Sequence, residues 1–135
     1  MRARTAVNLI SIVDDDPAVR RTTVRLVESF DFRAAAFESG DSFLRSGQAN
    51  ETSCLVLDLQ MSGMNGLQLQ SHLNAAGYSI PIIFITAYGK THSRQRAVQA
   101  GAVAFLDKPF SDELLLQSIR AALRQDDDGG KTARL

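Results

Sequence analysis

The sequence predicts an α/β domain built on a single, doubly wound, five-stranded parallel sheet with helices on both faces. Two observations lead to this prediction. Five short apolar runs recur along the chain, separated by segments of helical period. The runs are continuous rather than alternating, which is typical of strands covered on both faces, as in a parallel sheet. Strands that alternate with helices require right-handed crossovers, and such crossovers place helices against the sheet.

The five apolar runs are the predicted strands. In chain order they are residues 9–13, 34–37, 54–57, 82–85 and 103–106, of which the second is the weakest. For five such strands the flavodoxin-like order 2-1-3-4-5 is the natural arrangement. Ligands then bind beyond the carboxyl ends of strands 1 and 3.

The segments between the runs are predicted to be helices because apolar residues recur on one side of each. The first begins after Asp16 as N-cap, with Pro17 at its first position, and Ser111 can cap the last. Two polar segments, 41–45 and 93–100, are expected to form half-exposed helices. The expected core sides of the third and fifth helices are Leu69, Leu73 and Ala76, and Leu115, Ile119, Ala122 and Leu123.

Length and composition describe one globular domain. The chain has 135 residues, of which 44% are hydrophobic. Residues 1–125 are expected to form the domain, and 126–135, rich in Asp and Gly, a C-terminal tail or the start of a linker. Fifteen basic residues balance fifteen acidic ones, so we expect no direct contact with nucleic acid. A lone Cys54 suits the reducing cytoplasm, and no run approaches the ~20 apolar residues of a membrane-spanning helix.

Acidic residues follow the two strands whose carboxyl ends should be neighbours. Asp14 and Asp15 come directly after the first strand, and Asp58 follows the third. Carboxylates brought together repel one another unless they share a cation, and Mg²⁺ prefers hard oxygen ligands. Thr86 after the fourth strand and Lys108 after the fifth supply a hydroxyl and a positive charge that suit an anion at the same edge. Together these residue types indicate a magnesium-dependent phosphoryl-transfer site.

Four strings of the sequence resemble the receiver domain of two-component response regulators. They are Ile12-Val13-Asp14-Asp15-Asp16, Leu57-Asp58-Leu59-Gln60-Met61, Ile85-Thr86-Ala87 and Asp107-Lys108-Pro109-Phe110. Each stands at a predicted strand end in the family's order, and the resemblance spans residues 8–124. It implies a phosphoacceptor switch rather than an enzyme, similar to the receivers joined to helix-turn-helix transcription factors.

The resemblance also implies which residues take part in phosphoryl transfer. Asp58 would accept the phosphoryl group from the phosphohistidine of a sensor histidine kinase. Asp15 would bind Mg²⁺ directly and Asp14 would hold the ion through water. Asp58 and the backbone carbonyl of Gln60 would complete the protein's share of the metal ligands.

Three more residues would transmit the switch. Lys108 would bridge the acceptor carboxylate and the phosphoryl oxygens, and its bond to Pro109 would be cis. Thr86 would move its hydroxyl to the phosphoryl group, and Phe105 would be the switch aromatic that then turns inward. A surface formed by 88–100, the fifth strand and the fifth helix would repack, giving a phosphorylation-dependent homodimer or releasing an output domain.

The chain departs from the family pattern after Met61, where Pro normally stands and Ser62 is found here. Because Pro fixes φ, its loss is expected to loosen the loop without touching a metal ligand. Gln60 and Tyr88 occupy positions that vary in the family and tune dephosphorylation. Tyr88 is expected to shield the phosphoryl group from water.

Other functions remain open at this point. A receiver that acts only as a phosphorylation-independent docking module would keep the fold and lose part of the site, whereas here every required position is filled. An aspartyl-phosphate hydrolase would carry an Asp-x-Asp-x-Thr pattern, and Ala18 stands where its hydroxyl is needed. A flavin or nucleotide carrier would need a glycine- or hydroxyl-rich loop after the first strand, where three aspartates stand instead.

Overall fold

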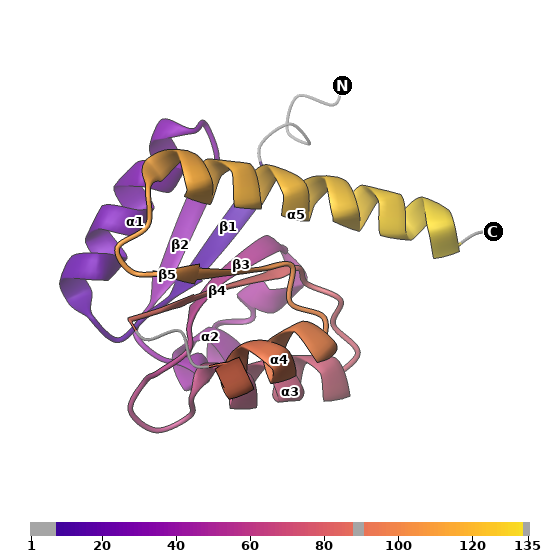
Figure 1. The fold of residues 1–135 in the computed structure, drawn as a ribbon, viewed down its shortest axis with the longest axis horizontal. Coiled ribbons are helices and arrows are strands. Elements are labelled where there is room, and N and C mark those ends of the chain that lie inside the picture. Colours follow the sequence, from indigo (N-terminus) through magenta and orange to yellow (C-terminus); the bar gives the residue numbers. More distant parts are fainter. Residues whose placement is uncertain (1–7, 88–90, 134–135) are drawn as a thin grey trace.

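The computed structural model describes residues 8–87 and 91–133, and in this part of the chain five strands alternate with five α-helices (Figure 1). The strands are β1 (Leu9–Val13), β2 (Arg33–Phe37), β3 (Thr52–Asp58), β4 (Ile82–Thr86) and β5 (Ala104–Asp107). The helices are α1 (Pro17–Ser29), α2 (Gly40–Ser46), α3 (Gly66–Ala75), α4 (Thr91–Gln99) and α5 (Asp112–Ala133). A short 3₁₀ helix spans Gln48–Asn50.

The sheet is parallel throughout and has the predicted order, β2-β1-β3-β4-β5. Val13, the last residue of β1, lies opposite Leu57 of β3, so the residues that follow both reach the same edge of the sheet. At the other pair of strands Thr86 lies opposite Asp107. The register therefore brings the carboxyl ends of β1, β3, β4 and β5 together, as the sequence predicted.

Two hydrophobic clusters cover the two faces of the sheet. One lies under α1 and α5, and the other under α2, α3 and α4 (Figure 1). Along β3, Cys54 and Val56 belong to the first cluster, whereas Leu55 and Leu57 belong to the second. This alternation puts apolar side chains on both faces, which explains why the strand is a continuous apolar run. Each such buried side chain contributes roughly 1.5–3 kcal/mol relative to exposure.

Two helices begin at the residues that the sequence indicated. The Asp16 carboxylate accepts a hydrogen bond from the Ala18 N–H at 2.9 Å, and Pro17 is the first residue of α1. At the start of α5 the Ser111 hydroxyl accepts from the Leu114 N–H at 3.0 Å. Each cap contributes about 1 kcal/mol to its helix. The caps also set where the loops after β1 and β5 end, and these loops carry site residues.

The core side of α3 is only partly as expected. Leu69 and Leu73 are buried, but Ala76 is exposed at the end of the helix, so its assignment to the core was wrong. Gln70 is buried instead, and its side-chain amide donates to the Ala97 carbonyl of α4 at 3.1 Å. This bond satisfies the buried amide and joins the two helices.

Helix α5 continues beyond the expected end of the domain at residue 125. It runs to Ala133, through most of the segment that the composition marks as a tail or linker. Of its expected core side, Leu115, Ile119 and Ala122 are buried, and Leu123 is partly buried against the same cluster. Within residues 8–87 and 91–133, no helix combines the length and the apolar character that a membrane crossing requires.

Candidate functional site

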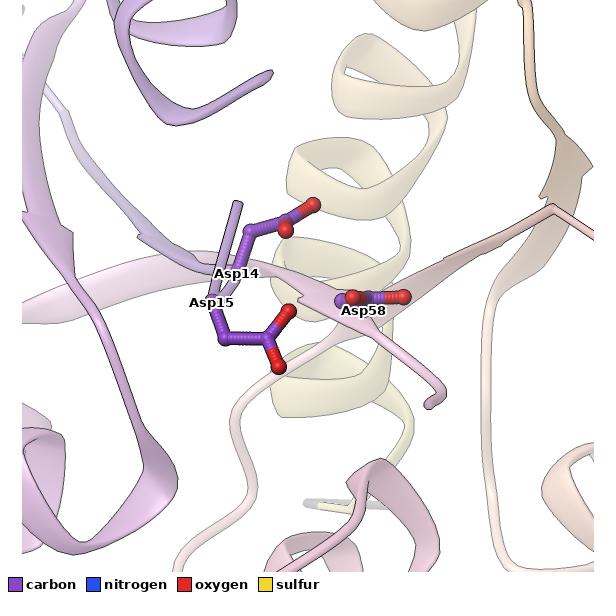
Figure 2. A group of neighbouring side chains, drawn as sticks. All are labelled: Asp14, Asp15 and Asp58. Atoms are coloured by element: carbon purple, nitrogen blue, oxygen red, sulfur yellow. The ribbon is translucent and has the colours of Figure 1, made fainter. Parts of the chain in front are cut away.

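Three aspartates meet at the carboxyl edge of the sheet, and we call Asp14, Asp15 and Asp58 the acid cluster (Figure 2). One carboxylate oxygen of each lies within 4.8 Å of those of the other two. Asp14 is 0% exposed and Asp58 is 4% exposed, whereas Asp15 faces solvent. Negative charges this close repel strongly where water is scarce, so the acid cluster requires positive charge nearby.

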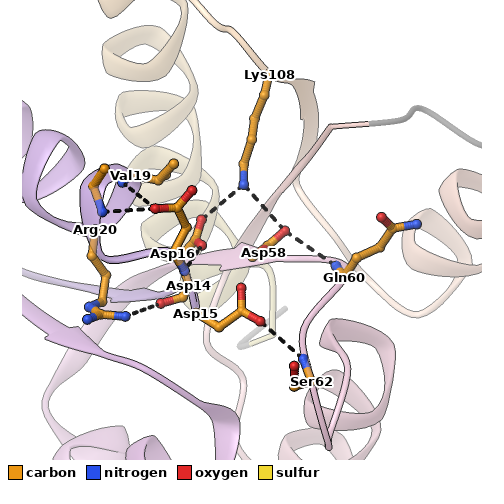
Figure 3. Close-up of polar contacts among 10 residues, drawn as sticks. Asp14, Asp15, Asp16, Val19, Arg20, Asp58, Gln60, Ser62 and Lys108 are labelled. Carbon is orange, nitrogen blue, oxygen red and sulfur yellow. Dashed lines mark hydrogen bonds and ion pairs between the residues drawn. The ribbon is translucent and has the colours of Figure 1, made fainter.

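Lys108 supplies positive charge to the acid cluster. Its Nζ lies 3.2 Å from Asp14 Oδ2 and 3.7 Å from Asp58 Oδ1 (Figure 3). The lysine reaches the acids from the loop after β5, and its peptide bond to Pro109 is cis, as the resemblance implies. One ammonium facing three carboxylates leaves an excess of negative charge, which suits a divalent cation with oxygen ligands.

Backbone N–H groups hold each acid of the cluster in place (Figure 3). The bonds are Asp16 N–H to Asp14 Oδ1 at 2.9 Å, Gln60 N–H to Asp58 Oδ1 at 3.3 Å, and Ser62 N–H to Asp15 Oδ2 at 3.1 Å. Arg20 of α1 also donates from Nη1 to the Asp14 carbonyl at 2.8 Å, a contact that sequence reasoning missed. Backbone N–H groups have no rotamers of their own, so they orient the carboxylates more firmly than flexible side chains would.

The Ser62 contact corrects one expectation. Replacement of the family's Pro by Ser62 was expected to leave the metal ligands untouched. The backbone N–H of Ser62 instead contacts Asp15, which is one of the expected ligands. Proline has no N–H and could not make this bond. The overlooked signal was the donor that proline lacks, rather than the φ angle that it fixes.

Burial raises the pKa of Asp58 from its ordinary value of 3.8 to about 6. Loss of hydration is the largest cause, and repulsion from Asp14 comes next, with a smaller contribution from Asp15. The Lys108 charge and the Gln60 N–H act in the opposite direction. Because the pKa stays below 7, most Asp58 is ionised at neutral pH. A cation in the acid cluster would favour that charged form further.

Thr86 and Phe105 lie on the neighbouring strands β4 and β5. Thr86 is fully buried, and its backbone carbonyl accepts a hydrogen bond from the Lys108 N–H at 2.7 Å. Phe105 is partly buried, with its ring centroid 5.9 Å from that of Phe84 in the core. Strands β4 and β5 therefore connect Lys108, which lies beside the acid cluster, with the Phe105 ring, which lies on the face of the sheet covered by α4.

Sequence reasoning also missed Arg94 of α4. Its guanidinium carbon lies 4.6 Å from the centroid of the Phe105 ring, and its Nη2 lies 3.7 Å from Asp107 Oδ2. A guanidinium over an aromatic face is attracted to it. No local spacing rule could have linked these residues, because they come from a helix and a strand that only the fold brings together. Tyr88, the expected shield, lies outside the described residues.

The chain is similar to known proteins in both sequence and fold. Residues 10–120 match the response regulator receiver domain. Nodulation protein W of Bradyrhizobium diazoefficiens is 41% identical over 118 residues, covering 87% of this chain and 52% of that protein. Response regulator protein TodT of Pseudomonas putida is 42% identical over 117 residues, covering 87% of this chain and 52% of that protein. The chain thus spans about half the length of these curated relatives.

Solved structures show the same similarity. The response regulator StyR aligns with a TM-score of 0.86 at 37% identity, covering 95% of this chain and 65% of that one. FixJ-N aligns with a TM-score of 0.79 at 32% identity, covering 87% of this chain and 94% of that one. The matched residues 10–120 include the acid cluster, Thr86, Phe105 and Lys108. The chain therefore belongs to the response regulator receiver domain family of two-component signal transduction.

Proposed function

We propose that Asp58 accepts a phosphoryl group from the phosphohistidine of a sensor histidine kinase, and that the domain is a switch rather than an enzyme with a separate substrate. Receiver domains of response regulators are switches and generally bind Mg²⁺ at an acidic site. The observation that carries the proposal for this chain is buried Asp58, which lies beside Lys108 and within the acid cluster.

The acid cluster and the backbone carbonyl of Gln60 are the proposed ligands of Mg²⁺. Their chemistry fits the ion, because Mg²⁺ takes hard oxygen donors and commonly one or two carboxylates, with waters and phosphate oxygens completing its octahedron. Asp58 supports the assignment, since burial and repulsion from Asp14 and Asp15 raise its pKa although Lys108 and the Gln60 N–H act against them. When bound, the ion neutralises charge on the carboxylates and on the phosphoryl oxygens.

In the proposed transfer, a carboxylate oxygen of Asp58 forms a bond to phosphorus while the phosphorus–nitrogen bond of the donor breaks. The electron pair of that bond stays on the imidazole nitrogen. Lys108 Nζ, 3.7 Å from Asp58 Oδ1, is near enough to contact the transferred oxygens. The Thr86 hydroxyl donates a hydrogen bond to the same oxygens, and Phe105 turns inward as Thr86 moves. The three new acceptor oxygens supply the driving force for this movement.

The proposed output surface comprises α4, β5 and α5, and its repacking drives homodimerisation or releases an output domain. Val98 of α4 is 56% exposed, as an apolar side chain in a contact surface would be.

FixJ of Azorhizobium caulinodans, 34% identical to this chain, is named a transcriptional regulatory protein, which supports a role in transcription regulation. The balanced charge supports DNA contact by a partner domain rather than by this one. The proposed location is the cytoplasm, where buried Cys54 stays reduced.

The test is intact mass after incubation with acetyl phosphate, with Mg²⁺ or with EDTA. Wild type should gain one phosphoryl group only with Mg²⁺, and Asp58→Asn should gain none. The matched control is Asp16→Asn, which removes a neighbouring charge outside the acid cluster and keeps an N-cap side chain for α1. Asp16→Asn should be phosphorylated like wild type.

Two outcomes would contradict the proposal. A phosphoryl group on Asp58→Asn would place the acceptor elsewhere. No adduct on wild type would favour a phosphorylation-independent docking module. Light scattering on the phosphorylated protein then tests the homodimer, which requires the molecular mass in solution to double on phosphorylation.

A further inference from the structure

Asp15 differs from the other two acids of the cluster in how it is held. Asp14 and Asp58 are buried, and each has both a backbone N–H and Lys108 beside it. Asp15 is exposed, and within the described part of the chain its carboxylate has one hydrogen-bond donor, the backbone N–H of Ser62 (Figure 3). The orientation of Asp15 therefore depends on this single bond of 3.1 Å.

The donor belongs to a loop that is itself well anchored. Ser62 lies between β3 and α3, and the base of that loop is closed by a hydrogen bond from the Gly66 N–H to the Leu59 carbonyl at 2.9 Å. The Asn65 side chain caps α3 where the loop ends. The bond from Ser62 to Asp15 thus connects the loop after β3 with the loop after β1, which carries Asp14 and Asp15, while Asp58 ends β3 itself.

A held carboxylate matters because an exposed Asp side chain otherwise samples several rotamers. Metal binding to a free side chain must stop that motion, whereas a side chain oriented in advance has already lost it. A carboxylate has about four lone-pair sites on its two oxygens, so a bond to Oδ2 leaves room for a cation. Loss of a hydrogen-bond partner that orients a metal ligand in this way lowers the affinity for the metal.

We propose that the backbone N–H of Ser62 positions Asp15 for the divalent cation. This inference rests on the proposed Mg²⁺ site and adds a positioning group to it. The hydroxyl of Ser62 takes no part, because the donor is the main chain. Any residue other than proline can supply the N–H, and proline cannot.

This distinction defines a matched pair of variants. Ser62→Ala keeps the N–H and removes the hydroxyl, whereas Ser62→Pro removes the N–H. Mg²⁺ is titrated into metal-free protein by isothermal titration calorimetry, and circular dichroism checks that each variant is folded. We expect Ser62→Ala to bind like wild type and Ser62→Pro to bind about tenfold more weakly, the lower end of the range for a lost orienting partner.

The outcomes separate this inference from the proposed function. If wild type binds no Mg²⁺, the proposed metal site fails. If wild type binds and folded Ser62→Pro binds as tightly or more tightly, the positioning role is overturned. A Ser62→Ala variant as weak as Ser62→Pro would also overturn it, because the hydroxyl would then be the responsible group.

A second measurement covers the case in which Ser62→Pro does not fold. The Ser62 amide proton is observed by NMR in metal-free wild type and in Asp15→Ala. Loss of a charged acceptor should move this resonance upfield by more than it moves the Gln60 amide, which donates to Asp58 instead. An unmoved Ser62 resonance would show that the bond is absent in solution and would overturn the inference.

Discussion

The acid cluster at the ends of β1 and β3 and the aromatic contact between α4 and β5 differ in how deeply their charged side chains are buried. In the acid cluster, Asp14 and Asp58 are buried and are held by backbone N–H groups and by Lys108. In the aromatic contact, which comprises Arg94, Phe105 and Asp107, the two charged side chains are 43% and 59% exposed and their charged atoms lie 3.7 Å apart.

This difference in burial indicates which part of the domain is rigid and which part can rearrange. Charges in a buried site are costly to separate or to leave unpaired, so Asp14, Asp58 and Lys108 have few alternative arrangements. Exposed ion pairs contribute only about 0–1 kcal/mol, so the aromatic contact can open at little cost. The region proposed to receive the phosphoryl group is therefore firmly built, and the region proposed to respond is weakly held.

The largest expected effect comes from removing the buried charge at the centre of the acid cluster. The fold raises the pKa of Asp58 from 3.8 to about 6, so folding favours its protonated form. This contribution to stability is fully present below the unfolded pKa and is lost as the pH rises through the folded value. In EDTA at pH 7, Asp58→Asn should therefore be more stable than wild type by about 2–3 kcal/mol.

Urea unfolding at several pH values checks this prediction. The stability gain of Asp58→Asn should shrink as the pH is lowered toward 4, and Mg²⁺ should reduce it at pH 7 by stabilising wild type. Asp41→Asn, which removes an exposed acid of α2, is the control and should not be more stable than wild type at pH 7. Equal stability of Asp58→Asn and wild type at pH 7 would show that the acid cluster is not electrostatically strained.

A second effect, of about 1–3 kcal/mol, is expected where α3 approaches the acceptor strand. A Cβ added at Gly66 would lie 2.7 Å from the Asp58 carbonyl oxygen and 3.0 Å from the Leu59 Cα, both main-chain atoms. Gly66→Ala should therefore be destabilised in urea. Gly40→Ala is the control, because the nearest atom there is a side-chain sulfur at 3.0 Å, which can move. Equal losses in the two variants would mean that the close approach at Gly66 is not decisive.

A smaller effect is expected at the aromatic contact. Arg94→Ala removes the guanidinium from the Phe105 ring and from Asp107, and should reduce stability by about 0.5–1 kcal/mol. Arg94→Lys should recover only part of this, because an ammonium lacks the planar group that stacks on a ring. Urea unfolding and the Phe105 ring resonances measure both changes. A loss above 2 kcal/mol for Arg94→Ala would contradict the view that this region is weakly held.

The smallest effect is expected at the most exposed of these ion pairs, which sets the scale for the others. Arg45 and Asp41 lie one turn apart on α2, with 3.0 Å between their charged atoms and side chains that are 72% and 62% exposed. Arg45→Ala should change stability by no more than about 0.5 kcal/mol, and high salt should abolish the difference. If Arg45→Ala cost as much as Arg94→Ala, the aromatic ring would add nothing to the contact of Arg94.

The sequence by itself determined the sheet, its order and the edge at which the acids meet. Continuous apolar runs such as 54–57 reflect burial on two faces, and caps such as Asp16 and Ser111 are local signals. The convergence of Asp14 with Asp58 follows from parallel strands that end at one edge, so it needs no knowledge of loop conformation.

Only the tertiary structure decided which groups contact one another across loops and helices. The bond from Ser62 to Asp15 joins two loops, the stacking of Arg94 on Phe105 joins a helix to a strand, and Gln70 finds its partner on α4. The raised pKa of Asp58 likewise depends on how much water its surroundings exclude. Periodicity and spacing describe neighbours along the chain, whereas these contacts depend on distances between segments that are remote in sequence.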